Sequence, residues 1–310
     1  MTGASTGLPD PLAARVANRR WLVTGAHGML GRDLVAILTA AGATVTVTDR
    51  DEVDITDLAA TRSAVADHDL VVNTAAWTNV DAAEANEEAA TRINGLGPTN
   101  LATACTELGA RLLHVSTDYV LAGDASAPYS EHTPPDPINA YGRSKLVGEQ
   151  AVLRLAPAMG YLVRTAWLYG AHGGNFVATV LRLAEQREHL DIVDDQRGQP
   201  TWAYALALRL VELGVAAVDH AAPAGIYHGT ASGETTWFGL ARAVFAEAGL
   251  DPDRIRPTTS DRYPRPARRP TYSVLAHSGW AQAGLPPLDE WRRMLTLALP
   301  SLLAARQTSA

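Results

Sequence analysis

The chain has 310 residues and a formal net charge of −7, from 26 basic and 33 acidic side chains. This length allows one large or two smaller domains, and the acidic excess gives no reason to expect nucleic acid or an anionic membrane as a partner. The single cysteine, Cys105, excludes an internal disulfide and a metal site built from cysteines alone. We find no run of membrane-spanning length and no signal peptide, which predicts a cytoplasmic location.

The first clear motif, WLVTGAHGMLG at residues 21–31, predicts a strand, a tight turn and the start of a helix. Gly25 permits the turn, Gly28 lets a pyrophosphate approach the backbone, and Gly31 lets the helix pack closely on the strand. The helix N-terminus favours phosphate. A structural turn is the alternative, because the spacing is GxxGxxG rather than GxGxxG. Asp49, at the end of the next strand, stands where a carboxylate holds a ribose diol, and we therefore predict a dinucleotide site.

Strands and helices alternate after this unit, whereas residues 1–19 contain alanine, glycine and proline and are expected to form a flexible arm. Unbroken apolar runs are typical of buried parallel strands. Alternation with right-handed crossovers predicts an α/β fold with a doubly wound parallel sheet. Strands are predicted at 43–48, 69–74, 111–116, 161–167 and 190–193, and helices at 30–38, 57–67, 88–93, 98–108, 139–155, 175–187, 236–248 and 288–305.

The alternation loosens after residue 194, where loops that contain proline appear. We expect residues 20–168, together with about 202–222, to form an NAD(P)-binding domain. Residues 169–201 and 223–310 are expected to form a smaller substrate-binding lobe over the carboxyl ends of the strands, where such folds bind ligands.

Tyr141 and Lys145 stand four residues apart near the start of a predicted helix, so they share a face. A nearby ammonium lowers the pKa of a phenol, and the phenol could then exchange a proton near neutral pH. A lone Y-x-x-x-K is more typical of a solvated helix surface. Ser116 and Thr117 end a predicted strand at the edge where active sites assemble, and their hydroxyls could hold a carbonyl oxygen or cap a turn.

The glycine motif, the Ser-Thr pair at a strand end and the Y-x-x-x-K motif occur in this order along the chain. In this respect the chain resembles the extended, nucleotide-sugar branch of the short-chain dehydrogenase/reductase superfamily, whose members have a Rossmann fold. The likeness covers nearly the whole chain from Trp21 onward. The stretches that carry it are NTAAWTNVDAAE at 73–84, STDYV at 116–120, RTAWLY at 164–169, DDQRGQPT at 194–201 and PARRP at 266–270. In these stretches the chain resembles the dTDP-4-dehydrorhamnose reductase family.

The resemblance implies that a hydride passes from NADPH, or from NADH, to the C4 ketone of a dTDP-linked 6-deoxy sugar. It implies that Tyr141 protonates the developing alkoxide, that Lys145 binds the nicotinamide ribose and adjusts the pKa of Tyr141, and that Thr117 bonds the ketone oxygen. The nine histidines show no ligand-pair spacing, so we expect no metal site. We expect a monomer or a homodimer.

The resemblance also implies which residues contact the two ligands. Trp167 is expected beside the sugar, with a buried core aromatic as the alternative. Arg268 is expected at the diphosphate, with a solvated arginine loop as the alternative. The residues expected around the dinucleotide are Gly25, His27, Gly28, Met29, Leu30, Gly31, Asp49, Arg50, Asp54, Ile55, Ala75, Ala76, Tyr141 and Lys145, and those expected at the substrate are Thr117, Trp167, Asn175, Gln199, Thr201 and Arg268.

Four other functions compete with this interpretation. A 4,6-dehydratase carries Thr-Asp-Glu where this chain has Thr117, Asp118 and Tyr119, so elimination would lack its acid. An epimerase is disfavoured by the C-terminal half. A non-catalytic, NADP-binding regulatory subunit is disfavoured because Tyr141 and Lys145 are intact. A dTDP-dihydrostreptose synthase of aminoglycoside biosynthesis is not separated from a rhamnose-forming enzyme by these residues.

Two neighbouring residues give opposite indications on the cofactor. Asp49 favours NADH, because a carboxylate repels a 2′-phosphate, whereas Arg50 can pair with that phosphate. We therefore expect both cofactors to be used, with NADPH preferred.

Overall fold

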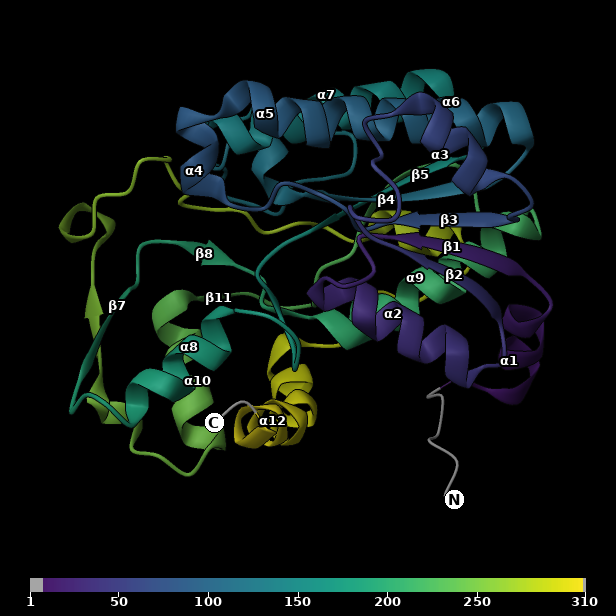
Figure 1. Ribbon diagram of the computed structural model, residues 1–310. Coiled ribbons are helices and arrows are strands. Elements are labelled where there is room, and N and C mark those ends of the chain that lie inside the picture. Colours follow the sequence, from purple (N-terminus) through teal and green to yellow (C-terminus); the bar gives the residue numbers. More distant parts are fainter. Residues whose placement is uncertain (1–7, 309–310) are drawn as a thin grey trace.

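The computed structural model describes residues 8–308 and has a six-stranded parallel sheet at its centre (Figure 1). The strand order β10-β5-β4-β3-β1-β2 reverses its direction of growth between β1 and β3. At such a reversal the loops beyond the carboxyl ends of the strands separate and leave a crevice. The strands are β1 Arg20–Thr24, β2 Thr44–Thr48, β3 Leu70–Asn73, β4 Arg111–Thr117, β5 Gly160–Thr165 and β10 Gly225–His228.

Helices cover both faces of this sheet, which confirms the doubly wound α/β fold (Figure 1). Successive side chains of a strand point to opposite faces, so Trp21 and Val23 pack into one apolar core and Leu22 into another. One face carries α1 Asp10–Ala17, α2 Met29–Ala40 and α9 Ala203–Val218. The other carries α3 Leu58–Val65, α6 Gly97–Leu108 and α7 Ala140–Leu155, and the chain between α3 and α6 includes α4 Val80–Ala85, α5 Glu87–Thr91 and a π-helical segment, Arg92–Leu96.

A second group of elements has an apolar core of its own and lies beside the sheet (Figure 1). Val180, Leu240, Phe245 and Leu295 are buried in this core. Its elements are α8 Phe176–Ala184, β7 Leu190–Val193, α10 Trp237–Glu247, β12 Ile255–Thr258 and α12 Trp291–Thr308, and the short pairs β6 Leu168–Tyr169 with β9 Thr201–Trp202 and β8 Arg197–Gly198 with β11 Thr235–Thr236 lie between it and the sheet. Among residues 8–308, no helix combines the length and the apolar character that crossing a membrane requires.

The structure corrects the boundary expected at residue 223. Strand β10 pairs in parallel with β5 and completes the large sheet, and the following α11, Ser278–Gln282, buries Trp280 in the core of that sheet. Residues 225–228 therefore belong to the sheet and residues 278–282 pack against it, so neither segment is part of the lobe that was expected to bind substrate. A four-residue edge strand is too short to show a period in the sequence, which is why the expectation failed.

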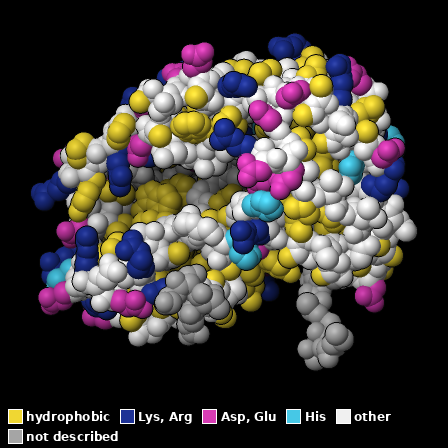
Figure 2. Space-filling view, in the orientation of Figure 1, with side chains coloured by type: hydrophobic (Ala, Val, Ile, Leu, Met, Phe, Trp, Pro, Cys, Tyr) yellow, Lys and Arg dark blue, Asp and Glu magenta, His cyan; other side chains and the backbone are white. Residues whose placement is uncertain are grey.

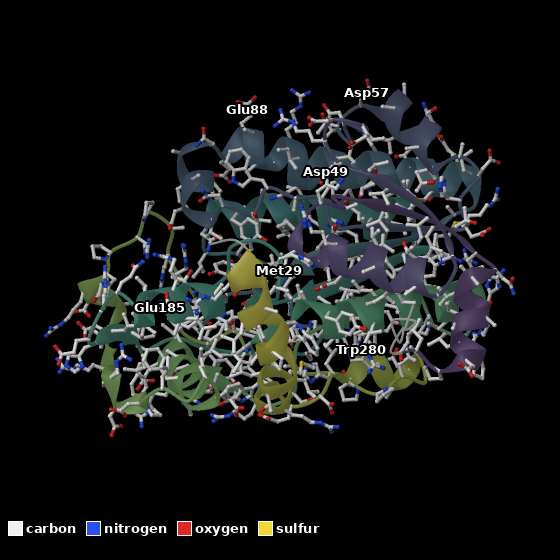
Figure 3. The ribbon with its side chains drawn as sticks, turned by 60° about the horizontal axis from the view of Figure 1, so that its bottom comes forward. Met29, Asp49, Asp57, Glu88, Glu185 and Trp280 are labelled. Atoms are coloured by element: carbon white, nitrogen blue, oxygen red, sulfur yellow. The ribbon has the colours of Figure 1, made fainter. Side chains whose placement is uncertain are left out.

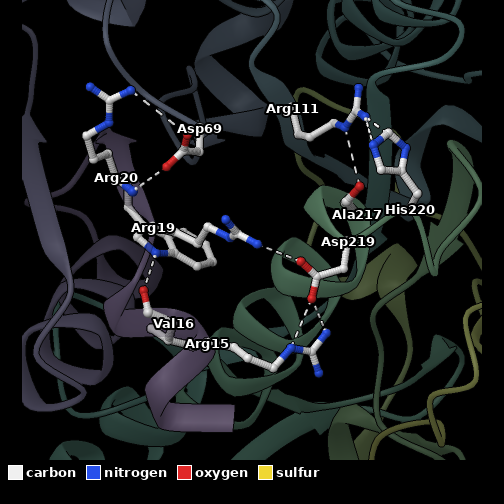
Figure 4. Close-up of polar contacts among 10 residues, drawn as sticks. Arg15, Val16, Arg19, Arg20, Asp69, Arg111, Ala217, Asp219 and His220 are labelled. Carbon is white, nitrogen blue, oxygen red and sulfur yellow. Dashed lines mark hydrogen bonds and ion pairs between the residues drawn. The ribbon is translucent and has the colours of Figure 1, made fainter.

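The structure also corrects the flexible arm expected at residues 1–19. Of these, residues 1–7 lie outside the described part, and α1 docks against the sheet domain. Its Val16 is fully buried, and Arg15 and Arg19 both form ion pairs with Asp219, just after α9 (Figure 4). Alanine-rich composition suggested flexibility, but it is also favourable to a helix once tertiary contacts are available.

Candidate active site

A cleft of about 1100 Å³ opens at the carboxyl ends of β1, β3, β4 and β5, and Figure 2 shows a hollow between the two halves of the molecule. Most of the residues expected at the cofactor line it, which means that chain segments more than a hundred residues apart meet there. The expected residues in its lining are Gly25, Gly28, Met29, Leu30, Gly31, Asp49, Arg50, Asp54, Ile55, Ala75, Ala76, Thr117, Tyr141, Lys145 and Trp167.

The glycine turn packs more closely than residues with a Cβ would allow, and it leads into the first turn of α2. Gly25 has φ +69°, and a Cβ there would lie 2.4 Å from the amide nitrogen of Ala75. A Cβ on Gly31 would lie 2.5 Å from the carbonyl oxygen of Gly25, so α2 can pack this closely only with glycine. Gly28 precedes α2 as its N-cap and lines the cleft. The free N–H groups at the start of α2 therefore suit a pyrophosphate.

At one end of the cleft, backbone groups hold the carboxylate of Asp49. It accepts hydrogen bonds from the amide N–H of His27, at 3.0 Å, and from that of Arg50, at 2.8 Å. Met29 and Asp49, both labelled in Figure 3, line the cleft from α2 and from the end of β2. The ring of His27 is exposed and lies 3.7 Å from Asp49, outside the cleft lining that the structure describes.

Two guanidinium groups, not one, lie at this end of the cleft. Arg50 was expected, and Arg92 at the start of the π-helical segment also lines the cleft, 3.3 Å from the hydroxyl of Thr56. The pKa of Asp54 is lowered, first by hydrogen bonds from Thr56 and to a smaller extent by the two arginines. Sequence reasoning missed Arg92 because an arginine in a helical segment is usually solvated, although π-helical turns are frequent at functional sites.

The helix α7 starts at a position that brings Tyr141 to the end of β4. The side chain of Asn139 caps α7 by accepting a hydrogen bond from the Gly142 amide at 2.8 Å. A Cβ on Gly142 would lie 2.1 Å from the carbonyl oxygen of Tyr119, so only glycine allows α7 to pack this closely against the segment that follows β4. The Tyr141 phenol consequently lies beside Thr117, whose side chain acts to lower the pKa of the phenol.

Burial determines the protonation of the expected catalytic groups. It raises the pKa of Tyr141 to about 12, with a further contribution from the Asp118 carboxylate. Burial lowers the pKa of Lys145 to about 8, opposed by Glu149. The expectation that Lys145 lowers the pKa of the phenol is therefore wrong for this structure. The reason is that Lys145 donates instead to the carbonyl oxygen of Val115, at 2.8 Å.

Four residues expected at the substrate lie outside the cleft lining that the structure describes. Gln199 and Thr201 are buried in hydrogen bonds with one another and with Leu275. Asn175 caps α8, and Arg268 is exposed on its loop. The structure thus brings only Trp167 and Thr117 of the expected substrate residues into this cleft, and contacts from the other four stay predictions.

Sequence reasoning also missed two buried polar residues beneath Lys145. Asn73 ends β3 and His114 lies within β4, and both are fully buried. The available signal was their polarity, because Asn73 ends an apolar strand and His114 interrupts an apolar run in a strand that is covered on both faces.

Comparison with known proteins places the chain in a family. Residues 19–303 match the family model described as RmlD substrate binding domain. A dTDP-4-dehydrorhamnose reductase of Streptomyces griseus is 55% identical, covering 91% of this chain and 94% of the relative. A dTDP-4-keto-6-deoxy-D-glucose reductase of Streptomyces niveus is 50% identical, covering 92% and 98%.

Solved structures agree with these relatives. A dTDP-4-dehydrorhamnose reductase from Clostridium acetobutylicum superposes with a TM-score of 0.86 at 37% identity, covering 92% of this chain and 99% of that one. The enzyme of the same name from Bacillus anthracis, in complex with NADP, also gives 0.86 at 34% identity, covering 91% and 99%. The extent of these matches shows that the chain belongs to the RmlD family, the dTDP-4-dehydrorhamnose reductases.

Proposed function

We propose that the protein transfers a hydride from NADPH to the C4 ketone of a dTDP-linked 4-keto-6-deoxy sugar. One observation carries this proposal: Thr117, Tyr141 and Lys145 line the same cleft as the glycine turn before α2. A proton donor, a hydroxyl that can bind a carbonyl oxygen and a phosphate-binding helix N-terminus thereby serve one cavity.

The protonated state of Tyr141 suits the reduction. When bound, the nicotinamide supplies the hydride. The phenol, with a pKa of about 12, keeps its proton at neutral pH and can donate it to the oxyanion that develops at C4. Thr117 donates its hydroxyl to the same oxygen, and Lys145 binds the nicotinamide ribose. The buried Asp118 carboxyl, whose pKa burial raises to about 6, accepts the Thr117 hydroxyl at 3.0 Å before the substrate arrives.

Two features support NADPH over NADH. Arg50 and Arg92 both reach the cleft and can pair with a 2′-phosphate. Asp49 is occupied by two backbone N–H groups, which reduces its repulsion of that phosphate. The relative from Bacillus anthracis was solved with NADP bound. Asp49 can still accept a ribose hydroxyl, so NADH is proposed as a weaker cofactor.

The names of the relatives support a dTDP sugar with a ketone at C4 as the substrate, but they name two different sugars. We propose dTDP-4-dehydro-6-deoxy-L-mannose, which would give dTDP-L-rhamnose, on the name of the Streptomyces griseus relative. The Streptomyces niveus relative is named for the D-glucose form, which makes dTDP-4-keto-6-deoxy-D-glucose the second candidate.

The test offers the purified protein NADPH and each of the two sugars separately, follows NADPH oxidation and identifies the product by mass spectrometry and NMR. The proposal expects turnover of the L-mannose form to dTDP-L-rhamnose. A dihydrostreptose product would show that the proposed product is wrong, and turnover of the D-glucose form alone would show that the proposed substrate is wrong. Tight NADPH binding without turnover of either sugar would favour a regulatory subunit.

A further inference from the structure

A chain of buried hydrogen bonds leads from the cofactor segment to Lys145. Asn73 Oδ1 accepts from the Thr24 hydroxyl at 2.7 Å and from the Ala75 amide at 3.1 Å. Asn73 Nδ2 lies 2.9 Å from His114 Nδ1, and His114 Nε2 lies 3.3 Å from Lys145 Nζ. Asn73, His114 and Lys145 are at most 2% exposed, so each polar atom needs a partner inside the protein.

The backbone fixes the direction of this chain. The Ala75 amide can only donate, so it must face the oxygen of Asn73 and not its NH₂ group. The NH₂ group therefore faces His114, where it donates to Nδ1. A neutral imidazole carries a single N–H, and with Nδ1 accepting, that proton is on Nε2. The neutral form is favoured because burial, and then the charge of Lys145, hold the pKa of His114 well below its usual range.

The Nε2–H of His114 consequently points at Lys145. An ammonium group has three donors and no acceptor, so it cannot receive this N–H. A neutral amine has a lone pair and can receive it, while it still donates to the Val115 carbonyl at 2.8 Å. On α7, Glu149 acts in the opposite direction and favours the ammonium. It is itself bonded to Arg164 of β5 at 2.9 and 2.7 Å, and Tyr141 is the other titratable group of α7 at this cleft.

We propose that His114 is a positioning residue for Lys145, which it holds against the Val115 carbonyl while its Nε2–H disfavours the ammonium form. The proposal rests on the proposed function in one respect, because Lys145 is taken as the group that binds the nicotinamide ribose. Turnover should then fall as the pH rises through the titration of Lys145, and His114 determines where this alkaline fall occurs. The amide N–H of Ala75 fixes the orientation of the Asn73 side chain, and through Asn73 it fixes the tautomer of His114. Ala75 itself lines the cofactor cleft.

The first test reads the tautomer directly, without substrate or cofactor. Long-range ¹H–¹⁵N NMR of protein labelled in histidine distinguishes the two neutral tautomers and the imidazolium, and the signals of His114 are assigned by their loss in His114→Asn. The expected result is the Nε2–H tautomer at neutral pH. The Nδ1–H tautomer, or an imidazolium, would overturn the proposal. If His114→Asn does not fold, substitutions of the other histidines assign their signals, and the signals of His114 are then identified by elimination.

The second test measures the pH profiles of kcat and of NADPH affinity in His114→Asn. The amide oxygen of the new side chain can take the place of Nδ1 and accept from Asn73, while the donor that faces Lys145 is lost. The alkaline fall should move upward by about one pH unit, the size of change that one hydrogen bond produces. The matched control is His228→Asn, a buried histidine of the same sheet whose Nδ1 faces the Ala276 carbonyl, and its alkaline fall should stay in place.

An unmoved alkaline fall in folded, active His114→Asn would overturn the proposal, as would an equal shift in the control. A wild-type protein with the Nε2–H tautomer and a pH-dependent NADPH affinity, but with no turnover of any dTDP sugar, would count against the proposed function and support the role of His114. The two failures are therefore distinguishable.

Discussion

The indole of Trp167 stacks on that of Trp237, with ring centroids 3.5 Å apart and ring planes 9° apart. Trp167 follows β5 and lines the cleft, whereas Trp237 begins α10 in the second core. Trp167 has φ +48°, a conformation that a bulky residue adopts only when its surroundings hold it there. A Cβ on Gly198 would lie 2.6 Å from the Trp167 ring, so this ring is confined by both neighbours.

Replacing Trp237 should therefore weaken binding of the dTDP sugar and leave binding of the cofactor unchanged. Trp237 is fixed by a hydrogen bond from its Nε1 to Gln196 at 3.1 Å and by the nearby ring of Phe176. In Trp237→Leu, Trp167 loses its stacking partner. We expect KM for the dTDP sugar to rise about 2- to 10-fold, because this range corresponds to the free energy of one aromatic pair, and we expect NADPH affinity to stay unchanged. Trp237→Phe should restore most of the loss. Equal losses for both ligands would indicate general destabilisation instead.

Tyr141→Phe should bind NADPH normally and lose most of its turnover. Removing the phenol proton donor should lower kcat by about 10²- to 10⁴-fold. Tyr119→Phe serves as the control, because its half-buried ring lies edge-on to Tyr141 at 5.7 Å and carries the same hydroxyl. Steady-state kinetics of both variants provide the measurement, and near-normal kcat in folded Tyr141→Phe would remove this residue from the mechanism.

Arg50→Ala and Arg92→Ala test the preference for NADPH. If both guanidinium groups pair with the 2′-phosphate, each variant should raise KM for NADPH and hardly change KM for NADH. A charge-assisted hydrogen bond of about 1.5–3 kcal/mol corresponds to an increase of roughly 10- to 100-fold. Kinetics with the two cofactors make the comparison. A protein that uses only NADH and ignores both substitutions would show that Asp49 sets the choice.

Glu149→Leu should destabilise the fold. Glu149 and Arg164 form a doubly hydrogen-bonded ion pair with 2% and 1% of their side chains exposed. Removing one partner leaves a buried charge, and we expect the free energy of unfolding to fall by about 3–5 kcal/mol. Urea denaturation measures it. The double variant Glu149→Leu/Arg164→Met should recover much of the loss, and a double variant as unstable as the single one would refute this explanation.

The sequence predicted what local patterns determine. The glycine turn and the parallel sheet follow from residue spacing and from apolar runs, and Tyr141 and Lys145 from their separation along one helix. Spacing does not reveal depth of burial, so the pKa of Tyr141 was expected to fall and instead is raised. Neither α1 nor β10 could be predicted, because each is short and depends on contacts with distant residues such as Asp219 and those of β5. The side-chain contacts of His114 likewise depend on distant residues, because they join β4 to β3 and to α7.

Hydride transfer to C4 is the central claim, and isotope transfer tests it most directly. The protein would be incubated with NADPH deuterated at C4 of the nicotinamide and with dTDP-4-dehydro-6-deoxy-L-mannose, and the product examined by ¹H and ²H NMR. We predict one deuterium per product, at C4 of the sugar, when the transferred hydrogen is the labelled one of the two at that carbon. Sugar product without deuterium from either stereoisomer of the labelled cofactor, or deuterium at another sugar carbon, would contradict the account.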